Sequence, residues 1–247
     1  MQGAATIVFE TDTQYAHYQV WDMLYDGRPA RVLYSGQRQA AQSGIARDSR
    51  SDLLFDYNQR FLELVSGVLP TRLLLIGGGM YTLPMALLPI LPSLTIDVVE
   101  LDADLDAIAA RFFNLKPDHR LRIIHADGRD YLDHNTTLYD MILIDAFTHT
   151  APPDSLVSAE AVAQYKRSLK DDGIAATNII SALQGRGADD LKRLAKAYKM
   201  DFRQVDIFPA TQLLSPWLSQ NLVLVAQAGH SRPITSYLRH PPLDHLI

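Results

Sequence analysis

Three consecutive glycines, Gly77, Gly78 and Gly79, directly follow the apolar run Leu73 to Ile76 and precede a helical pattern. Glycines let a backbone approach a ligand closely, and the first N–H groups of a following helix are free to bind it. A strand, a glycine cluster and a helix in this order are typical of a loop that holds a nucleotide-like ligand. A tight strand-to-helix turn without a ligand has the same pattern, so this segment needs support from other residues.

Glu100 supplies that support, because it lies at the end of the next apolar run, Leu94 to Val99, 21 residues after Gly79. An acidic side chain at this place can accept hydrogen bonds from both hydroxyls of a ribose. The glycines and Glu100 together predict a nucleoside-type ligand. Asp102 has two interpretations, since it can contact the ligand or cap a helix that begins at Ala103.

Two more carboxylates follow later apolar runs. Asp127, with Gly128 beside it, comes after Leu121 to Ile124, and Asp145 comes directly after Met141 to Ile144. Asp127 can accept a hydrogen bond from the exocyclic amine of adenine, or it can cap the short helix that follows. Ligands of open α/β sheets bind at the carboxyl ends of the strands, which is where Asp145 is expected.

The elements that must position these residues form a regular alternation from Thr71 onward. The apolar runs do not alternate with polar residues, which indicates strands buried on both faces, and amphipathic helical segments lie between them. Five such strands are predicted at residues 73–76, 94–99, 121–124, 141–144 and 174–177. Helices are predicted at 83–91, 103–113, 159–169 and 187–198, and two more strands at 201–208 and 221–227. This order predicts a Rossmann-like α/β fold with a seven-stranded, mostly parallel sheet.

The chain before this alternation differs in pattern. Short β-rich runs, separated by turn residues such as Asp26-Gly27 and Ser35-Gly36, predict a small antiparallel unit at residues 1–50. A helix over 52–69, stopped by Pro70, leads into the main domain, which we place at residues 51–229. Residues 230–247 are expected to form an irregular tail.

Composition excludes several functions. The 247 residues are 47% hydrophobic and carry 23 Lys and Arg against 28 Asp and Glu, a net charge of -5, so nucleic acid is not an expected partner. The absence of cysteine excludes disulfides, thiolate metal sites and a cysteine nucleophile. The histidines lack metal-ligand spacing, and no apolar run reaches the ~18 residues of a membrane span. We therefore expect a cytoplasmic protein without a metal or a membrane partner.

The segments GGG, VVELD, HADGRDYL and YDMILIDAF, preceded by a β-unit with Tyr18-Gln19, resemble the spermidine synthase (polyamine aminopropyltransferase) family over about residues 15 to 227. That family is built on the class I AdoMet-dependent methyltransferase fold. The resemblance implies that Gly77, Gly78 and Gly79 line the thioadenosine and aminopropyl pocket. It further implies ribose binding by Glu100, adenine binding by Asp127 and Gly128, a place beside the sulfonium for Asp145, and substrate contacts for Gln19 and Tyr57.

Two positions depart from the family pattern. Met80 stands where the family has an acid that helps to hold the aminopropyl amine, and Thr148 stands where it has a second acid near the attacking amine. An alkylamine has a pKa of roughly 10 and arrives protonated, so a base that removes the proton is worth roughly 10²- to 10⁴-fold in rate. Threonine cannot be that base. Asp145 and, less favourably, His149 are the candidates.

The resemblance predicts a transferase that binds decarboxylated AdoMet or AdoMet as co-substrate and alkylates, by aminopropyl transfer, a small-molecule amine in polyamine metabolism. The first alternative is an AdoMet-dependent methyltransferase, which must bind the methionine carboxylate through a cation or free N–H groups. The loss of an acid at Met80 favours that alternative. The second alternative is a non-catalytic binding homologue that kept the pocket. A homodimer is the expected assembly.

Overall fold

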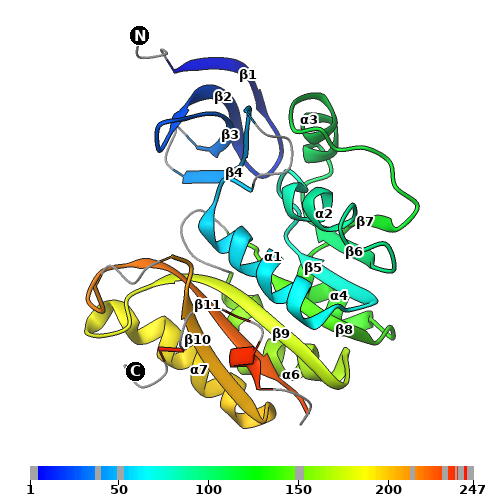
Figure 1. Cartoon of the computed structure of the whole chain (residues 1–247), viewed down its shortest axis with the longest axis vertical. Coiled ribbons are helices and arrows are strands. Elements are labelled where there is room, and N and C mark those ends of the chain that lie inside the picture. Colours follow the sequence, from blue (N-terminus) through cyan, green and yellow to red (C-terminus); the bar gives the residue numbers. More distant parts are fainter. Residues whose placement is uncertain are drawn as a thin grey trace.

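The computed structural model describes residues 5–36, 40–48, 53–147, 153–211, 215–229, 233–236, 238 and 242–243. Its amino-terminal part is a four-stranded antiparallel sheet with the strand order β1-β2-β3-β4 (Figure 1). The strands are β1 (Thr6–Asp12), β2 (His17–Tyr25), β3 (Arg28–Ser35) and β4 (Ala40–Ala46). Asp26 and Gly27, both with positive φ, make the two-residue turn between β2 and β3, as the Asp-Gly pair predicts.

The main domain is built on a seven-stranded sheet with the order β10-β11-β9-β8-β5-β6-β7. The strands are β5 (Arg72–Ile76), β6 (Thr95–Glu100), β7 (Leu121–His125), β8 (Tyr139–Ile144), β9 (Leu169–Ser181), β10 (Gln204–Pro209) and β11 (Gln220–Gln227). Strands β5 to β9 pair in parallel, whereas β11 lies antiparallel between β9 and β10. The predicted fold class, a mostly parallel seven-stranded sheet with a small amino-terminal β-unit, is confirmed. The strand order reverses between β5 and β8, the place where such sheets bind ligands.

Helices cover both faces of this sheet (Figure 1). They are α1 (Asp56–Val68), α2 (Thr82–Leu87), α3 (Leu105–Phe112), α4 (Gly128–His134), α5 (Asp154–Val157), α6 (Ala159–Arg167) and α7 (Asp189–Asp201). Alternate residues of β5 face opposite sides, so Leu73 and Leu75 pack in one core with α1, α2 and α3, whereas Leu74 and Ile76 pack in a second core with α4 to α7. None of the described helices has the length and hydropathy needed to span a bilayer.

Some element boundaries differ from the sequence prediction. The helix expected at 83–91 ends at Leu87, and the strand expected at 201–208 begins at Gln204 because α7 continues to Asp201. Strand β4 (Ala40–Ala46) was not predicted, since its residues AAQSGIA include few of the β-branched and aromatic residues that favour strands. In the tail, Ile234–Ser236 forms a 3₁₀ turn and Leu243 is buried against the second core.

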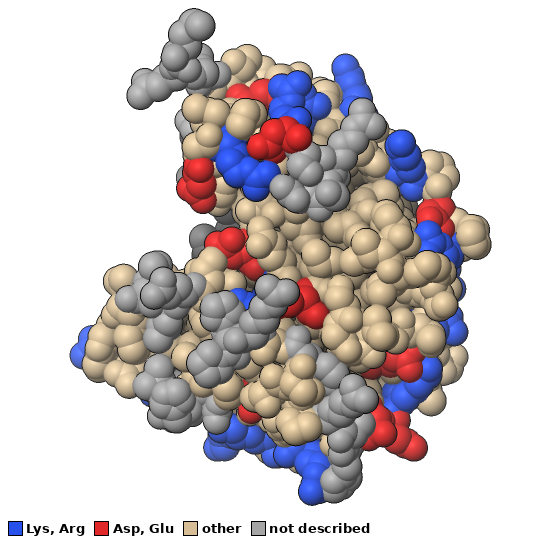
Figure 2. All heavy atoms as spheres, viewed as in Figure 1, with Lys and Arg blue, Asp and Glu red and all other residues tan. Residues whose placement is uncertain are grey.

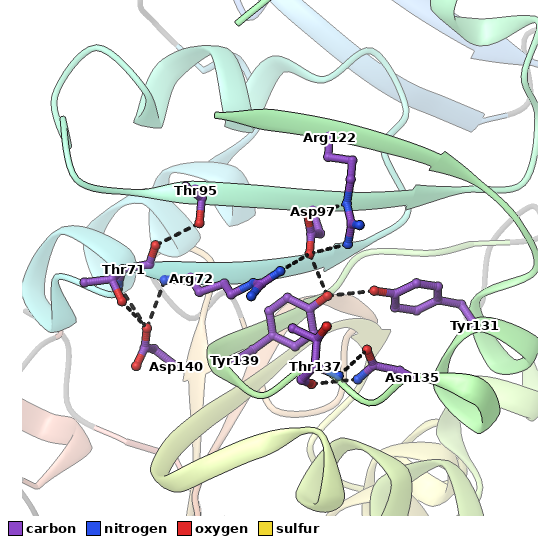
Figure 3. A network of polar contacts seen from close by, with 10 residues as sticks. All are labelled: Thr71, Arg72, Thr95, Asp97, Arg122, Tyr131, Asn135, Thr137, Tyr139 and Asp140. Carbon is purple, nitrogen blue, oxygen red and sulfur yellow. Dashed lines mark hydrogen bonds and ion pairs between the residues drawn. The ribbon is translucent and has the colours of Figure 1, made fainter. Parts of the chain in front are cut away.

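A polar network joins the strands near their amino ends, away from the glycine loop (Figure 3). Asp97 of β6 accepts two hydrogen bonds from Arg122 of β7, at 2.9 and 2.8 Å, and one from the hydroxyl of Tyr139 of β8 at 2.7 Å. Tyr139 also pairs with the hydroxyl of Tyr131 on α4 at 2.7 Å, and Arg72 of β5 lies 3.6 Å from Asp97. The network therefore ties four strands and α4 together around one buried carboxylate.

Candidate active site

A cavity of about 840 Å³ lies between the carboxyl edge of the large sheet and the amino-terminal sheet. This volume suits a ligand of nucleoside size or larger. Its lining includes most of the residues singled out from the sequence, namely Tyr57, Gly77, Gly78, Gly79, Glu100, Asp102, Asp127, Gly128 and Asp145. Residues from four separate strand ends and from α1 therefore meet around one space.

The glycine loop folds closely against the ends of β6 and β8. Gly77 has a φ of +92°, and a Cβ at this position would lie 2.4 Å from the carbonyl oxygen of Asp145. Glu100 holds the loop from the other side, because its Oε2 accepts from the N–H of Gly78 at 2.7 Å and of Gly79 at 3.0 Å. Its Oε1 accepts from the N–H of Asp102 at 3.0 Å, which leaves one acceptor direction on Oε1.

All five consecutive N–H groups from Gly77 to Tyr81 are bonded within the protein. Besides the two that Glu100 accepts, the N–H of Gly77 donates to the Val99 carbonyl, and that of Tyr81 donates to the Gly78 carbonyl. The N–H of Met80 donates to Oγ of Ser43 at 3.2 Å. Side chains and carbonyls of the protein therefore already take the N–H groups of the glycine loop itself. The expectation that the first N–H groups of the following helix, α2, are free for a ligand stays a prediction.

The side chain of Met80 does not reach the cavity. It is fully buried in the core that α1, α2 and α3 share, and it is absent from the cavity lining. The next residue, Tyr81, has a φ of +55°, packs its ring against Gly78 and donates its hydroxyl to Asp106 at 2.5 Å. This left-handed residue turns the chain into α2 and directs Met80 inward, so position 80 contributes neither an acid nor any other side chain to the cavity.

Asp102 stabilises the turn before α3 and holds the amino-terminal sheet. Its Oδ1 accepts from the N–H of Asp104, but α3 begins at Leu105 with Asp104 as its N-cap residue, so Asp102 is not the cap of a helix that begins at Ala103. Its Oδ2 accepts a 2.6 Å hydrogen bond from the hydroxyl of Thr13, which lies in the loop between β1 and β2. With the contact between Ser43 and Met80, this bond ties the amino-terminal sheet to the loops that follow β5 and β6.

Asp127 caps α4 and also lines the cavity. Its Oδ1 accepts from the N–H groups of Arg129 at 2.7 Å and Asp130 at 3.1 Å, and its Oδ2 takes no hydrogen bond from the described residues. A Cβ at Gly128 would lie 2.6 Å from Ile76, so glycine lets the start of α4 approach β5. The capping and ligand-facing interpretations of Asp127 are thus compatible in one side chain.

Asp145 has the most unusual environment of the acids that line the cavity. Its Oδ1 accepts from Nδ2 of Asn178 at 3.0 Å, and the hydroxyl of Tyr57 also donates to the carboxylate. Burial raises the pKa of Asp145 to about 7, although the hydrogen bonds from Asn178 and Tyr57 act in the opposite direction. Burial also raises the pKa of Tyr57 well above its usual value, so Tyr57 keeps its proton. Asp145 can therefore exchange a proton near neutral pH.

Gln19 lies on the far face of β2. Its side chain donates to Glu10 and accepts from Trp21, whereas its neighbour Tyr18 is buried and lines the cavity. Successive residues of a strand face opposite sides, so a shift of one position exchanges the two roles. This corrects the placement expected for Gln19. Thr148 and His149 lie outside the described residues, and their roles stay predictions.

Several residues of the site were not singled out from the sequence. Ser43, Thr13 and Asn178 carry no motif, since isolated Ser, Thr and Asn residues are common, and only the fold brings them to the loops described above. Asn178 has one usable signal, because a polar residue in the apolar strand Ile174 to Ile180 needs a buried hydrogen-bond partner.

The cavity is acidic. Six of the described residues that line it carry carboxylates. No described residue of the lining is Lys, Arg or His. The acids are Asp26, Asp56, Glu100, Asp102, Asp127 and Asp145. Figure 2 shows acidic side chains beside the indentation below the amino-terminal sheet, whereas most of the basic ones lie toward the periphery of this face. No three described His, Asp or Glu side chains are grouped so that they could hold a metal ion.

Known proteins resemble this chain in sequence. A polyamine aminopropyltransferase of Vibrio vulnificus is 29% identical over 184 residues, which are 72% of this chain and 61% of the relative. The human eEF1A lysine and N-terminal methyltransferase is 26% identical over 124 residues, 45% of this chain and 18% of the relative. The chain thus spans about three fifths of the aminopropyltransferase that it matches. No protein-family model matches the chain.

Solved structures share the fold. A probable spermidine synthase from Corynebacterium glutamicum superposes with a TM-score of 0.79 at 18% identity, covering 92% of this chain and 82% of that one. Human methyltransferase-like protein 13, in complex with SAH, superposes with a TM-score of 0.59 at 21% identity, covering 71% of this chain and 82% of that one. The resemblance to spermidine synthases on a class I methyltransferase-like fold is confirmed.

Proposed function

We propose that this protein transfers an aminopropyl group from decarboxylated AdoMet to a small amine. The observation that carries the proposal is the charge of the cavity, which has six carboxylates and, among the described residues, no cationic side chain. Decarboxylated AdoMet is a sulfonium with an ammonium tail, and the acceptor amine is also a cation. Both substrates therefore complement the cavity in charge.

The residues present fit a thioadenosine donor. Glycine at positions 77 and 128 lets the loop and the start of α4 pack closely against Asp145 and Ile76 at the edge of the cavity. Glu100 keeps one acceptor direction for a ribose hydroxyl, and Oδ2 of Asp127 keeps its capacity for the adenine amine. We place the sulfonium beside Asp145, between the glycine loop and Tyr57.

Decarboxylated AdoMet fits better than AdoMet. The methionine carboxylate of AdoMet would need a cation or free donors. No described cation lines the cavity and the N–H groups of the glycine loop are bonded within the protein, so the donors left to this carboxylate are neutral groups at the start of α2, such as the Thr82 hydroxyl. An incompletely paired buried carboxylate costs about 1 to 3 kcal/mol, which is roughly 10- to 100-fold in affinity.

Asp145 would act as the base. The amine nitrogen, once deprotonated by Asp145, attacks the methylene carbon bonded to sulfur. The carbon–sulfur bond breaks, its electron pair stays on sulfur, and methylthioadenosine leaves as a neutral thioether. A carboxylate with a pKa of about 7 suits this proton transfer near neutral pH.

Calorimetric titration with decarboxylated AdoMet, AdoMet and methylthioadenosine tests the proposal. We expect decarboxylated AdoMet to bind at least ~10-fold more tightly than AdoMet. Incubation of the decarboxylated donor with 1,4-diaminobutane should then release methylthioadenosine and the alkylated amine. The Asp145→Asn variant should bind the donor and lose turnover. Tighter binding of AdoMet, or binding without any product across a panel of amines, would contradict aminopropyl transfer.

Methyl transfer from AdoMet to an amine is the second candidate. Thr82, at the start of α2, lines the cavity, is only 7% exposed and has no hydrogen-bond partner among the described residues. Its hydroxyl can donate to a carboxylate, which favours AdoMet. If this candidate is correct, Thr82→Val will weaken the binding of AdoMet and leave methylthioadenosine, which has no carboxylate, unaffected.

A further inference from the structure

Two side-chain amides lie behind the carboxylate of Asp145. Asn178 of β9 donates from Nδ2 to Oδ1 of Asp145 at 3.0 Å, and its own Oδ1 accepts from Nδ2 of Asn221 on β11 at 3.1 Å. Asn178 is 1% exposed, so water does not satisfy its amide in place of these partners. The two strands are adjacent, with Asn221 paired to Ile180 in the ladder.

In this series of hydrogen bonds, every donor points the same way, from Asn221 to Asn178 and from Asn178 to Asp145. An ionised carboxylate accepts hydrogen bonds but donates none, so the atom of Asn178 that faces it must be the NH₂ group. The amide oxygen of Asn178 then faces Asn221, which must present its own NH₂ group. Each amide orientation therefore follows from the negative charge on Asp145.

We propose that Asn178 and Asn221 are positioning residues for Asp145, holding its carboxylate toward the acceptor amine and stabilising its ionised form. The inference rests on the proposed function, in which Asp145 is the base. In this arrangement, two neutral side chains behind the carboxylate of Asp145 orient it. Tyr57 holds the same carboxylate from α1, so Asp145 is fixed from two sides.

The environment of Asp145 makes these donors important. Among the described residues, the groups that act on its titration are the uncharged Asn178 and Tyr57, and burial opposes its ionised form. Glu100 and Asp127, on the neighbouring strand ends, line the same cavity and are also acidic. Hydrogen bonds from these neutral donors therefore favour the ionised form of Asp145, which is the form that can act as a base.

The test uses Asn178→Leu and the milder Asn221→Ala, with Thr177→Val as the matched control. Thr177 precedes Asn178 in β9 and is equally buried, but its hydroxyl pairs with Tyr198 at 2.8 Å on the other face of the sheet. The whole 247-residue chain is labelled with ¹³C at aspartate carboxyls. The Asp145 resonance, assigned by its loss in Asp145→Asn, is then titrated by NMR. The pH profile of kcat/KM is recorded in parallel.

We expect Asn178→Leu to raise the titration midpoint of Asp145 and the acidic limb of kcat/KM by about one pH unit, and Asn221→Ala to shift both less in the same direction. Thr177→Val should lower stability, but it should change neither the titration midpoint of Asp145 nor the acidic limb of kcat/KM. Unchanged Asp145 midpoints in both asparagine variants would overturn the inference, and so would an equal shift in Thr177→Val. If the NMR midpoint shifts but no variant, nor the parent protein, turns over amines, the positioning of Asp145 stands and the proposed function fails.

Discussion

The α-carbon of Gly77 approaches the backbone of Asp145 so closely that a Cβ on Gly77 would lie 2.4 Å from the Asp145 carbonyl oxygen. The N–H of Asp145 in turn donates to the carbonyl of Ile76, which precedes Gly77, at 2.8 Å. The glycine loop and the proposed base are therefore parts of one rigid junction between β5 and β8. A change in the loop must displace the carboxylate.

Gly77→Ala tests this junction. The methyl group would force the ends of β5 and β8 apart, so we expect a loss of ~2–3 kcal/mol in the free energy of unfolding and at least ~10-fold weaker donor binding. Urea unfolding and calorimetry measure the two effects. Gly27→Ala is the control, because Gly27 also has a positive φ, +79°, but no atom lies within 4 Å of its Cβ position. It should lose ~1 kcal/mol and bind donor normally; equal effects of the two changes on donor binding would disprove the coupling.

The raised pKa of Asp145 predicts a pH dependence of stability. Its pKa is about 7 in the folded protein and near 3.8 ordinarily, so between these values the folded state binds a proton that the unfolded chain has released. The free energy of unfolding contributed by Asp145 therefore falls as pH rises from about 4 to 7. Asp145→Asn lacks this dependence and should gain stability relative to the parent across that window, by at most ~4 kcal/mol.

Urea unfolding at several pH values measures this difference. Asp201→Asn, at the exposed end of α7, is the control and should differ from the parent by a nearly constant amount. A constant difference for Asp145→Asn as well would show that its carboxyl titrates near its ordinary pKa.

The hydrogen bond from Thr13 to Asp102 predicts that the amino-terminal sheet supports donor binding. Thr13→Val keeps the shape of the side chain and removes the hydroxyl, so Asp102 loses its 2.6 Å donor. We expect calorimetry to show about 5-fold weaker binding of methylthioadenosine, because the loss of this hydrogen bond reduces the binding free energy by roughly 1 kcal/mol. Thr11→Val, on the same segment but bonded weakly to the next carbonyl, should leave the affinity unchanged. Similar affinities for both variants would mean that the amino-terminal sheet does not organise the loops that follow β5 and β6.

The network around Asp97 predicts a purely structural effect (Figure 3). Tyr139→Phe removes a donor to Asp97 and the partner of Tyr131, and should lower the free energy of unfolding by ~1–3 kcal/mol. Donor affinity should change less than twofold, because the network lies near the amino ends of the strands. Tyr15→Phe, at an exposed tyrosine, should not change stability. A large loss of donor affinity in Tyr139→Phe would show that the network also positions Asp127 through α4.

The sequence by itself determined the main sheet and the types of residue at its carboxyl edge. Continuous apolar runs are stable only when both faces are covered, which is why the five parallel strands were predictable. Glycines and acids directly after such runs must meet at one edge, so Gly77, Glu100, Asp127 and Asp145 could be placed around one cavity from local pattern alone.

Only the tertiary structure decided which way individual side chains point and which distant residues touch them. One residue of register separates Tyr18 in the cavity from Gln19 outside it, and the left-handed turn at Tyr81 buries Met80. Asn178 and Tyr57 reach Asp145 from two elements far apart in the chain, and Asn221 reaches Asn178 from a third. Hydrogen bonds between such residues depend on how side chains pack to within about an ångström. Hydrophobic periodicity in the sequence predicts only which face of a strand or helix is buried.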